Sequence, residues 1–258
     1  MAYLKNIVGL ALLALIMVFY VITYWLITRK KVMPKFRTLP GLLALDEIVG
    51  RATEMGRPVL HSTGRGALYS SGVGTTLASF VIYGEVARRC AKMKTELITA
   101  IGTAEHIPII QSIAENAYRS ENALEELKYE NFVFVGGSQS SSNARIFALL
   151  EQRKPASFIV TGGYGADLCT LGGAGRAAGC LSLCGTTNTY QYPYAVAAYD
   201  YWLIGEDFLA TAAAISKDPP QVANIWAGDL FRFLLVGLIV IGVVLAWLGF
   251  NISEYLTI

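Results

Sequence analysis

SFIVTGG, at residues 157–163, is the stretch of sequence that decides the fold. The run Ser157–Thr161 is almost wholly apolar, lacks the polar alternation of a half-solvated strand, and ends in two glycines. A short run of this kind is typical of a strand buried on both faces, as in a parallel sheet. The same pattern recurs along the chain, at Val59–Thr63, Glu96–Ile101, Phe132–Val135, Cys180–Cys184 and Tyr201–Ile204.

Longer segments with helical spacing alternate with these runs. They are Leu42–Glu54, Thr75–Met93, Glu105–Arg119, Ser140–Arg153, a small-residue segment up to Ala178, Tyr192–Ala198 and Glu206–Ile215. Strands that alternate with helices favour a parallel sheet that is covered on both faces. We therefore predict an α/β fold, with a mainly parallel, Rossmann-like doubly wound sheet and helices on both faces, in a single domain at residues 41–218.

Two apolar runs without charged residues flank this domain, at Ile7–Thr28 and Phe233–Phe250. At 1.5 Å per residue, each is long enough to cross a hydrocarbon core of roughly 30 Å. A buried core helix would be apolar on one stripe rather than all round, and a cleaved signal peptide would not be followed by Arg29-Lys30-Lys31. We predict two transmembrane helices, at residues 7–28 and 230–250, joined to the domain by a basic linker at 29–40 and a second linker at 219–229.

Basic residues predict the orientation. Five of them follow the first apolar run, namely Arg29, Lys30, Lys31, Lys35 and Arg37, whereas Lys5 alone precedes it. Arg232 opens the second run and no Lys or Arg follows it. The positive-inside rule therefore predicts a two-pass protein of the cell membrane with a cytoplasmic domain, and with residues 1–6 and 251–258 outside. With a net charge of only +2, the basic cluster is explained by topology and anionic lipid, so the expected partner is the lipid bilayer and not nucleic acid.

Polar residues accompany the glycines that end the predicted strands. In a parallel sheet these strand ends lie along one carboxyl edge, where open α/β sheets bind ligands and helix N-termini favour anions such as phosphate. The alternative is that glycine permits tight turns and that Ser, Thr and Asn cap helices. The candidate ligand-binding residues are Gly64, Gly102, Thr103, Glu105, His106, Gly137, Ser138, Gln139, Gly163, Thr187, Asn188 and Glu206.

Motifs of nucleotide-binding and catalytic sites are incomplete. Gly173–Ala178 satisfies GxGxxA, but it neither follows a strand directly nor opens a helix, and a P-loop GxxxxGK[ST] is absent from the sequence. His61 lies in or at the end of a strand, where a hydrogen-bonded core residue is the commoner role, and His106 is the better placed of the two for acid–base work. The four cysteines show no CxxC spacing. We predict no catalytic residues and no metal site, and the sequence identifies no cofactor.

Two groups of residues suggest close contacts. Glycine and alanine between residues 162 and 179 favour close helix packing, including packing between subunits. The aromatic cluster formed by Tyr190, Tyr192, Tyr194, Tyr199, Tyr201 and Trp202 favours a subunit interface, because tyrosine supplies rigid contact area with a polar tip. Core and membrane-proximal positions are the alternatives for these side chains.

The stretches Leu39–Pro58 and Gly185–Asp207 resemble an uncharacterised family of prokaryotic membrane proteins that carries a domain of unknown function after an N-terminal membrane helix. Thr161–Ala166 and Ser216–Pro219 resemble this family too, so the likeness spans most of residues 39–220. The resemblance implies a prokaryotic source and a single domain. It brings no known activity and no functional residues.

Two functions follow as hypotheses. The first is a non-enzymatic, membrane-anchored structural or assembly protein that self-associates through its cytoplasmic domain, within a larger membrane complex or alone. The second is a ligand-binding sensor or enzyme that uses the glycine-rimmed crevice for a nucleotide or other phosphorylated metabolite.

Overall fold

A computed structural model describes residues 2–30, 40–70 and 72–248. The chain divides into two compact units, of which one is Phe36–Ser216 and the other combines Met1–Lys35 with Lys217–Ile258. The predicted basic linker beyond Lys30 and the predicted tail at 251–258 lie outside the described residues.

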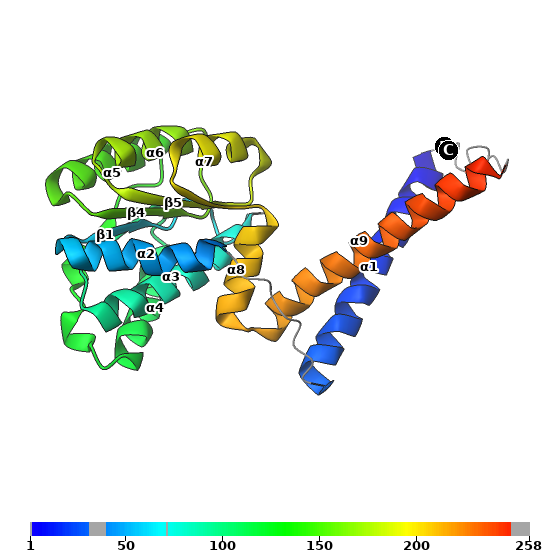
Figure 1. The fold of residues 1–258 in the computed structure, drawn as a ribbon, viewed down its shortest axis with the longest axis horizontal. Helices are drawn as coiled ribbons and strands as arrows, with labels where there is room; N and C mark the ends of the chain where they lie inside the picture. The colour runs from blue at the N-terminus through cyan, green and yellow to red at the C-terminus, as the bar shows by residue number, and fades with distance from the viewer. Residues whose placement is uncertain (1, 31–39, 71, 249–258) are drawn as a thin grey trace. The chain divides into compact units, whose positions relative to one another are not determined.

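The larger unit contains a six-stranded sheet in which every neighbouring pair is parallel (Figure 1). Its strands are β1 (Val59–Ser62), β2 (Leu97–Ile101), β3 (Phe132–Phe134), β4 (Ser157–Thr161), β5 (Leu181–Thr186) and β6 (Tyr201–Ile204). Their order is β3-β2-β1-β4-β5-β6, so the direction of winding reverses between β1 and β4. The predicted α/β class and the Rossmann-like parallel sheet are confirmed.

Helices cover both faces of this sheet, as predicted (Figure 1). One face carries α2 (Pro40–Met55), α3 (Val73–Met93), α4 (His106–Ser120) and α8 (Glu206–Ser216); the other carries α5 (Gln139–Arg153), α6 (Leu168–Ala177) and α7 (Tyr192–Ala198). Each face has its own apolar core, built around Tyr83 and Phe208 on the first and Phe158 and Tyr199 on the second. The four inner strands are buried almost throughout, which is why apolar residues on both faces dominate them and charged residues are absent from them.

The glycines of α6 allow this helix to approach its neighbours closely. A Cβ atom added at Gly172 would lie 2.6 Å from the Cβ of Ala198 and 2.7 Å from the Tyr199 ring, and one at Gly175 would lie 2.8 Å from Cδ1 of Phe158. These contacts are within the domain. The small residues predicted to permit close helix packing do so here between α6, α7 and β4.

The smaller unit consists of two helices that pack against each other, α1 (Ala2–Lys30) and α9 (Pro219–Trp247). Thr23 and Ile27 of α1 are buried, as are Val222 and Ala223 of α9. The Thr23 hydroxyl lies 3.2 Å from the carbonyl oxygen of Ala223, a hydrogen bond between residues 200 positions apart.

Within the described residues, one helix is long and apolar enough to cross a membrane, at Pro219–Val244. Leu13–Arg29 is also an apolar helix, but it is shorter. The part of the chain that the structure describes thus contains one candidate membrane span where the sequence predicts two.

The linker predicted at residues 219–229 is wrong, because α9 is already helical from Pro219 onward. Proline is compatible with the first turn of a helix, where the backbone N–H groups have no intrahelical partner. Residues in this first part of α9 are buried, notably Val222, Ala223 and Ala227. The two prolines therefore start α9 instead of forming a linker before it.

Candidate functional site

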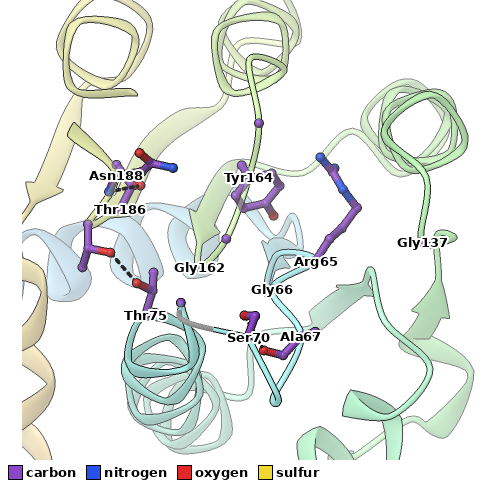
Figure 2. Close-up of a pocket in the computed structure, with 14 residues that line it drawn as sticks. Arg65, Gly66, Ala67, Ser70, Thr75, Gly137, Gly162, Tyr164, Thr186 and Asn188 are labelled. Atoms are coloured by element: carbon purple, nitrogen blue, oxygen red, sulfur yellow. Dashed lines mark hydrogen bonds between the residues drawn. The ribbon is translucent and has the colours of Figure 1, made fainter. Parts of the chain in front are cut away.

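A pocket of about 610 Å³ lies at the carboxyl ends of the strands, around the point where the winding reverses (Figure 2). Figure 2 shows Arg65 and Tyr164 on one side of it and Thr75 and Asn188 on the other. Its wall comes from the loops after β1, β3, β4 and β5 and from the start of α3. The described lining residues are Arg65, Gly66, Ala67, Ser70, Gly72, Thr75, Gly137, Gly162, Gly163, Tyr164, Gly165, Thr186, Thr187 and Asn188.

Glycine is required where the loops after β1 and β4 touch. Gly64 has a φ of +78° and Gly162 a φ of +107°, a region that favours glycine. A Cβ atom at Gly64 would lie 2.8 Å from the backbone nitrogen of Gly163, and one at Gly162 would lie 2.6 Å from the carbonyl oxygen of Thr63. The Arg65 N–H donates to the Gly163 carbonyl at 2.9 Å. At these two positions, glycine serves the close approach of one backbone to another.

Arg65 is held at the pocket wall by a buried carboxylate. Its Nη1 lies 2.7 Å from Oδ2 of Asp167, whose side chain is fully buried, whereas the Arg65 side chain is 12% exposed. The other Asp167 oxygen accepts the Gly165 N–H at 2.8 Å. The guanidinium carbon of Arg65 also lies 5.5 Å from the centre of the Tyr164 ring. The ion pair and the ring fix where the guanidinium sits.

Tyr164 in turn ties the wall to β1. Its hydroxyl donates to Oγ of Ser62 at 2.6 Å and accepts the Gly64 N–H at 3.1 Å. Burial raises the pKa of this phenol well above its ordinary value, so it stays protonated and able to donate.

Gln191 connects the loops after β4 and β5. Its side chain is buried, and its Nε2 donates to the carbonyls of Tyr164 and Gly165 while Oε1 accepts from the Thr186 hydroxyl at 2.6 Å. The hydroxyls of Thr75 and Thr187 also bond to each other, which links the start of α3 to the loop after β5. These side-chain contacts therefore hold together the loops after β1, β4 and β5 and the start of α3.

The chemistry of the wall suits a polar, anionic ligand. Arg65 carries the only formal charge among the described lining residues, and the rest of the polar surface consists of hydroxyls, one side-chain amide and glycine backbone. A guanidinium binds phosphate or carboxylate through paired N–H groups. None of these lining residues is His, Asp, Glu or Lys, so the described wall offers no general base of those types.

The predicted ligand-binding residues divide into two groups. Gly137, Gly163, Thr187 and Asn188 line the pocket, and Gly64 packs directly behind its wall. The structure places the others outside the lining, namely Gly102, Thr103, Glu105, His106, Ser138, Gln139 and Glu206. All seven follow β2, β3 or β6, and of the predicted residues after these strands Gly137 is the one that lines the pocket.

Two of the residues outside the lining have structural roles. Ser138 caps α5, where its hydroxyl accepts the Ser141 N–H at 3.2 Å. Oε1 of Glu105 accepts the Leu68 N–H at 3.1 Å and so steadies the loop after β1. The contacts of Ser138 and Glu105 therefore agree with the structural alternative, in which residues at the strand ends cap helices and stabilise turns.

The two histidines are buried and do not line the pocket. His61 bonds through Nε2 to the Thr161 hydroxyl at 2.8 Å, and burial lowers its pKa to about 3. Burial also lowers the pKa of His106, which packs edge-on against Phe80 with ring centres 5.0 Å apart. His61 is thus a neutral, hydrogen-bonded core residue, the role that its strand position favours.

The aromatic cluster also divides. Tyr199 is a core residue, and its hydroxyl donates to the Leu168 carbonyl at 2.9 Å. Tyr190, Tyr194 and Trp202 are exposed on the domain. Only the exposed members remain candidates for a contact surface.

Sequence reasoning missed Arg65, Tyr164, Asp167 and Gln191 as functional residues. A signal for Arg65 existed, because a charged residue stands between two glycines immediately after a strand. Its partnership with Asp167 joins residues 102 positions apart and follows only from the adjacency of β1 and β4.

The fold and the pocket together define the class: a parallel α/β protein of Rossmann-like strand order, with a polar pocket where the winding reverses. Residues 2–256 match the family described as "Domain of unknown function (DUF6754)", and the chain belongs to this family. No curated protein and no solved structure is significantly similar to the chain. The resemblance to an uncharacterised family is confirmed, whereas the prokaryotic source stays a prediction.

Proposed function

We propose that this protein is a membrane-anchored ligand-binding protein whose pocket takes a nucleotide or another phosphorylated metabolite. The observation that carries the proposal is Arg65, which the buried Asp167 holds at the wall of a glycine-rich pocket at the reversal point of the sheet. Open α/β sheets bind their ligands at this position. A sensor or binding role is favoured over catalysis, because the described wall lacks an acid–base pair.

The pocket offers complementary groups to each part of such a ligand. The guanidinium of Arg65 suits the phosphate. The hydroxyls of Ser70, Thr75 and Thr187 and the amide of Asn188 suit sugar hydroxyls or the edge of a base, since they both donate and accept. The volume of about 610 Å³ falls within the usual range for small-molecule sites.

We expect millimolar AMP, GMP, CMP, UMP or ribose 5-phosphate to raise the melting temperature of the full-length protein in mild detergent. A ligand at 100 times its dissociation constant stabilises a protein by about 2.7 kcal/mol, which for a domain of this size corresponds to roughly 5–10 °C. Arg65→Met should abolish the shift. Arg145→Met is the matched control, because Arg145 is exposed on α5 and does not line the pocket. A panel without any shift, or a shift that survives Arg65→Met, would contradict the proposal.

The anchoring part of the proposal is a two-pass arrangement in the cell membrane, with α1 and α9 as the two spans and the α/β domain in the cytoplasm. It is supported by the apolar sequence of both helices, by their mutual packing, and by the basic residues that follow Ile7–Thr28.

Cys169 reports on this orientation, because it is exposed whereas Cys90, Cys180 and Cys184 are buried. We expect a membrane-impermeant maleimide to leave the protein unlabelled in intact cells and to label it after permeabilisation. Cys169→Ser should remove the label. Labelling of Cys169 in intact cells would place the domain outside and overturn the orientation.

Self-association through the α/β domain stays a prediction. Exposed Tyr190, Tyr194 and Trp202 would supply its contact area. The mass of the detergent-extracted protein tests it, and a monodisperse monomer would count against it.

A further inference from the structure

The loop after β1 differs from that of a dinucleotide-binding site. In sheets of this strand order, a dinucleotide lies across the reversal point, and its pyrophosphate rests on a tight glycine turn between the first strand and its helix. Here a longer loop separates Ser62, the last residue of β1, from Val73, the first of α3. The loop after β1 folds over the reversal point instead of turning directly into the helix.

Backbone fills the space that a crossing pyrophosphate would need. Gly64 and Gly66 lie against the backbone of Gly163, so closely that an added Cβ at Gly163 would be 3.0 Å from Cα of Gly66. The hydrogen bond from Arg65 N–H to the Gly163 carbonyl closes the same gap at 2.9 Å. Glycines have no side chain that could swing aside, so this closure does not open by a rotamer change.

The region next to β2, where a carboxylate binds a ribose of the dinucleotide in such sheets, is also covered. A Cβ atom at Gly102, directly after β2, would lie 2.5 Å from Cγ of Arg65. Glu105 is the first carboxylate that follows β2 in the chain, and it already accepts the Leu68 N–H at 3.1 Å. A ribose placed there would meet the loop after β1 and a carboxylate that is already engaged.

We infer that the pocket takes a ligand with one nucleoside or sugar unit and one phosphate-bearing end, and that it excludes dinucleotides. This inference rests on the proposed function and specifies the class of ligand. Most of the described lining lies on the β5 side of the closed gap, where it continues from Arg65 toward Thr75, Thr187 and Asn188, and Gly137 adds backbone from the β3 side. A second nucleotide unit would have to pass through the contact between the loops after β1 and β4.

The test compares each mononucleotide with the dinucleoside diphosphate of the same base, and adds NAD⁺, on the full-length protein in detergent. We expect a mononucleotide to bind at least about tenfold more tightly than its dinucleoside counterpart, a difference measured by titration calorimetry. Arg65→Met should abolish mononucleotide binding and Arg145→Met should retain it. Arg65→Lys, which keeps the charge but lacks the paired N–H groups, should bind more weakly than the wild type.

The outcomes separate the two proposals. Equal, Arg65-dependent binding of a mononucleotide and its dinucleoside diphosphate would overturn the size limit and leave the proposed function standing. Absence of binding by every probe would overturn the proposed function itself. The ligand-free melting temperatures of the Arg65 variants show whether each variant is folded. If Arg65→Met is not folded, the affinity of Arg65→Lys is compared with that of the wild type instead.

Discussion

Replacing Gly172 with alanine is expected to destabilise the α/β domain by about 2 kcal/mol, because extra methyl groups in a well-packed core typically cost 1–3 kcal/mol. The new Cβ would lie 2.6 Å from the Cβ of Ala198, 2.7 Å from the Tyr199 ring and 3.1 Å from the Ala198 carbonyl oxygen. Two of these three neighbours are a Cβ atom and a backbone oxygen, which have no rotamer by which to move away. To relieve these contacts, α6 would have to move away from α7.

The next residue along the same helix is the control. Nothing lies within 4 Å of a Cβ added at Gly173, so alanine there only gains helix propensity, worth roughly 0.5–1 kcal/mol. The two neighbouring substitutions should therefore move the melting temperature of the full-length protein in opposite directions, separated by roughly 5–12 °C. If Gly172→Ala melted at or above the wild type, the close packing of α6 on α7 would be refuted.

The largest loss of stability is expected for Asp167→Ala, about 3–5 kcal/mol, because removal of one partner leaves a nearly buried guanidinium without its counter-charge. Asp167 is fully buried and accepts from both Arg65 and the Gly165 N–H, so alanine also removes the acceptor of a backbone donor. For a domain of this size, we expect a fall in melting temperature of roughly 6–20 °C.

The double variant Arg65→Met, Asp167→Leu should recover the part of this loss that comes from the unpaired charge, since apolar replacement of both partners leaves no buried charge, while the Gly165 N–H still lacks its acceptor. Glu126→Ala is the control for an exposed ion pair. Its carboxylate lies 3.9 Å from Lys94, both side chains are largely in water, and its removal should change stability by less than about 0.5 kcal/mol. A loss for Asp167→Ala as small as that for Glu126→Ala would show that the Arg65 pair does not brace the site.

The parallel sheet was predictable because its inner strands appear in the sequence as short, uncharged runs that are rich in apolar residues. Runs such as Ser157–Thr161 and Val59–Ser62 contain adjacent apolar residues that point to opposite faces, and each leads through glycine toward a helical pattern. Their order in the sheet was not predictable, because it depends on long-range pairing rather than on local sequence. Without that order, the six glycine-rich strand ends are equivalent.

The mixed outcome for the predicted site residues has the same cause. Gly163, Thr187 and Asn188 follow β4 and β5, which lie at or beside the reversal point, and they line the pocket. Thr103 and Glu206 follow β2 and β6 and do not, whereas Gly137 lines the pocket although it follows the edge strand β3. The start of α9 was mispredicted for a local reason, because a proline pair is equally compatible with a linker and with the first turn of a helix.

The hydrogen bond between α1 and α9 has a consequence for the order of events during synthesis. Thr23 precedes Ala223 by 200 residues, so α1 exists without its helical partner for roughly 10–40 s at usual translation rates. During that interval the Thr23 hydroxyl already has acceptors in its own helix, the carbonyls of Phe19 at 2.9 Å and Tyr20 at 3.0 Å. A hydroxyl has a single proton to donate. The Ala223 carbonyl of α9 therefore competes with acceptors that the Thr23 hydroxyl already has, and it is not the first partner of this hydroxyl. The Thr23 hydroxyl in α1 is therefore hydrogen-bonded both before and after α9 is synthesised.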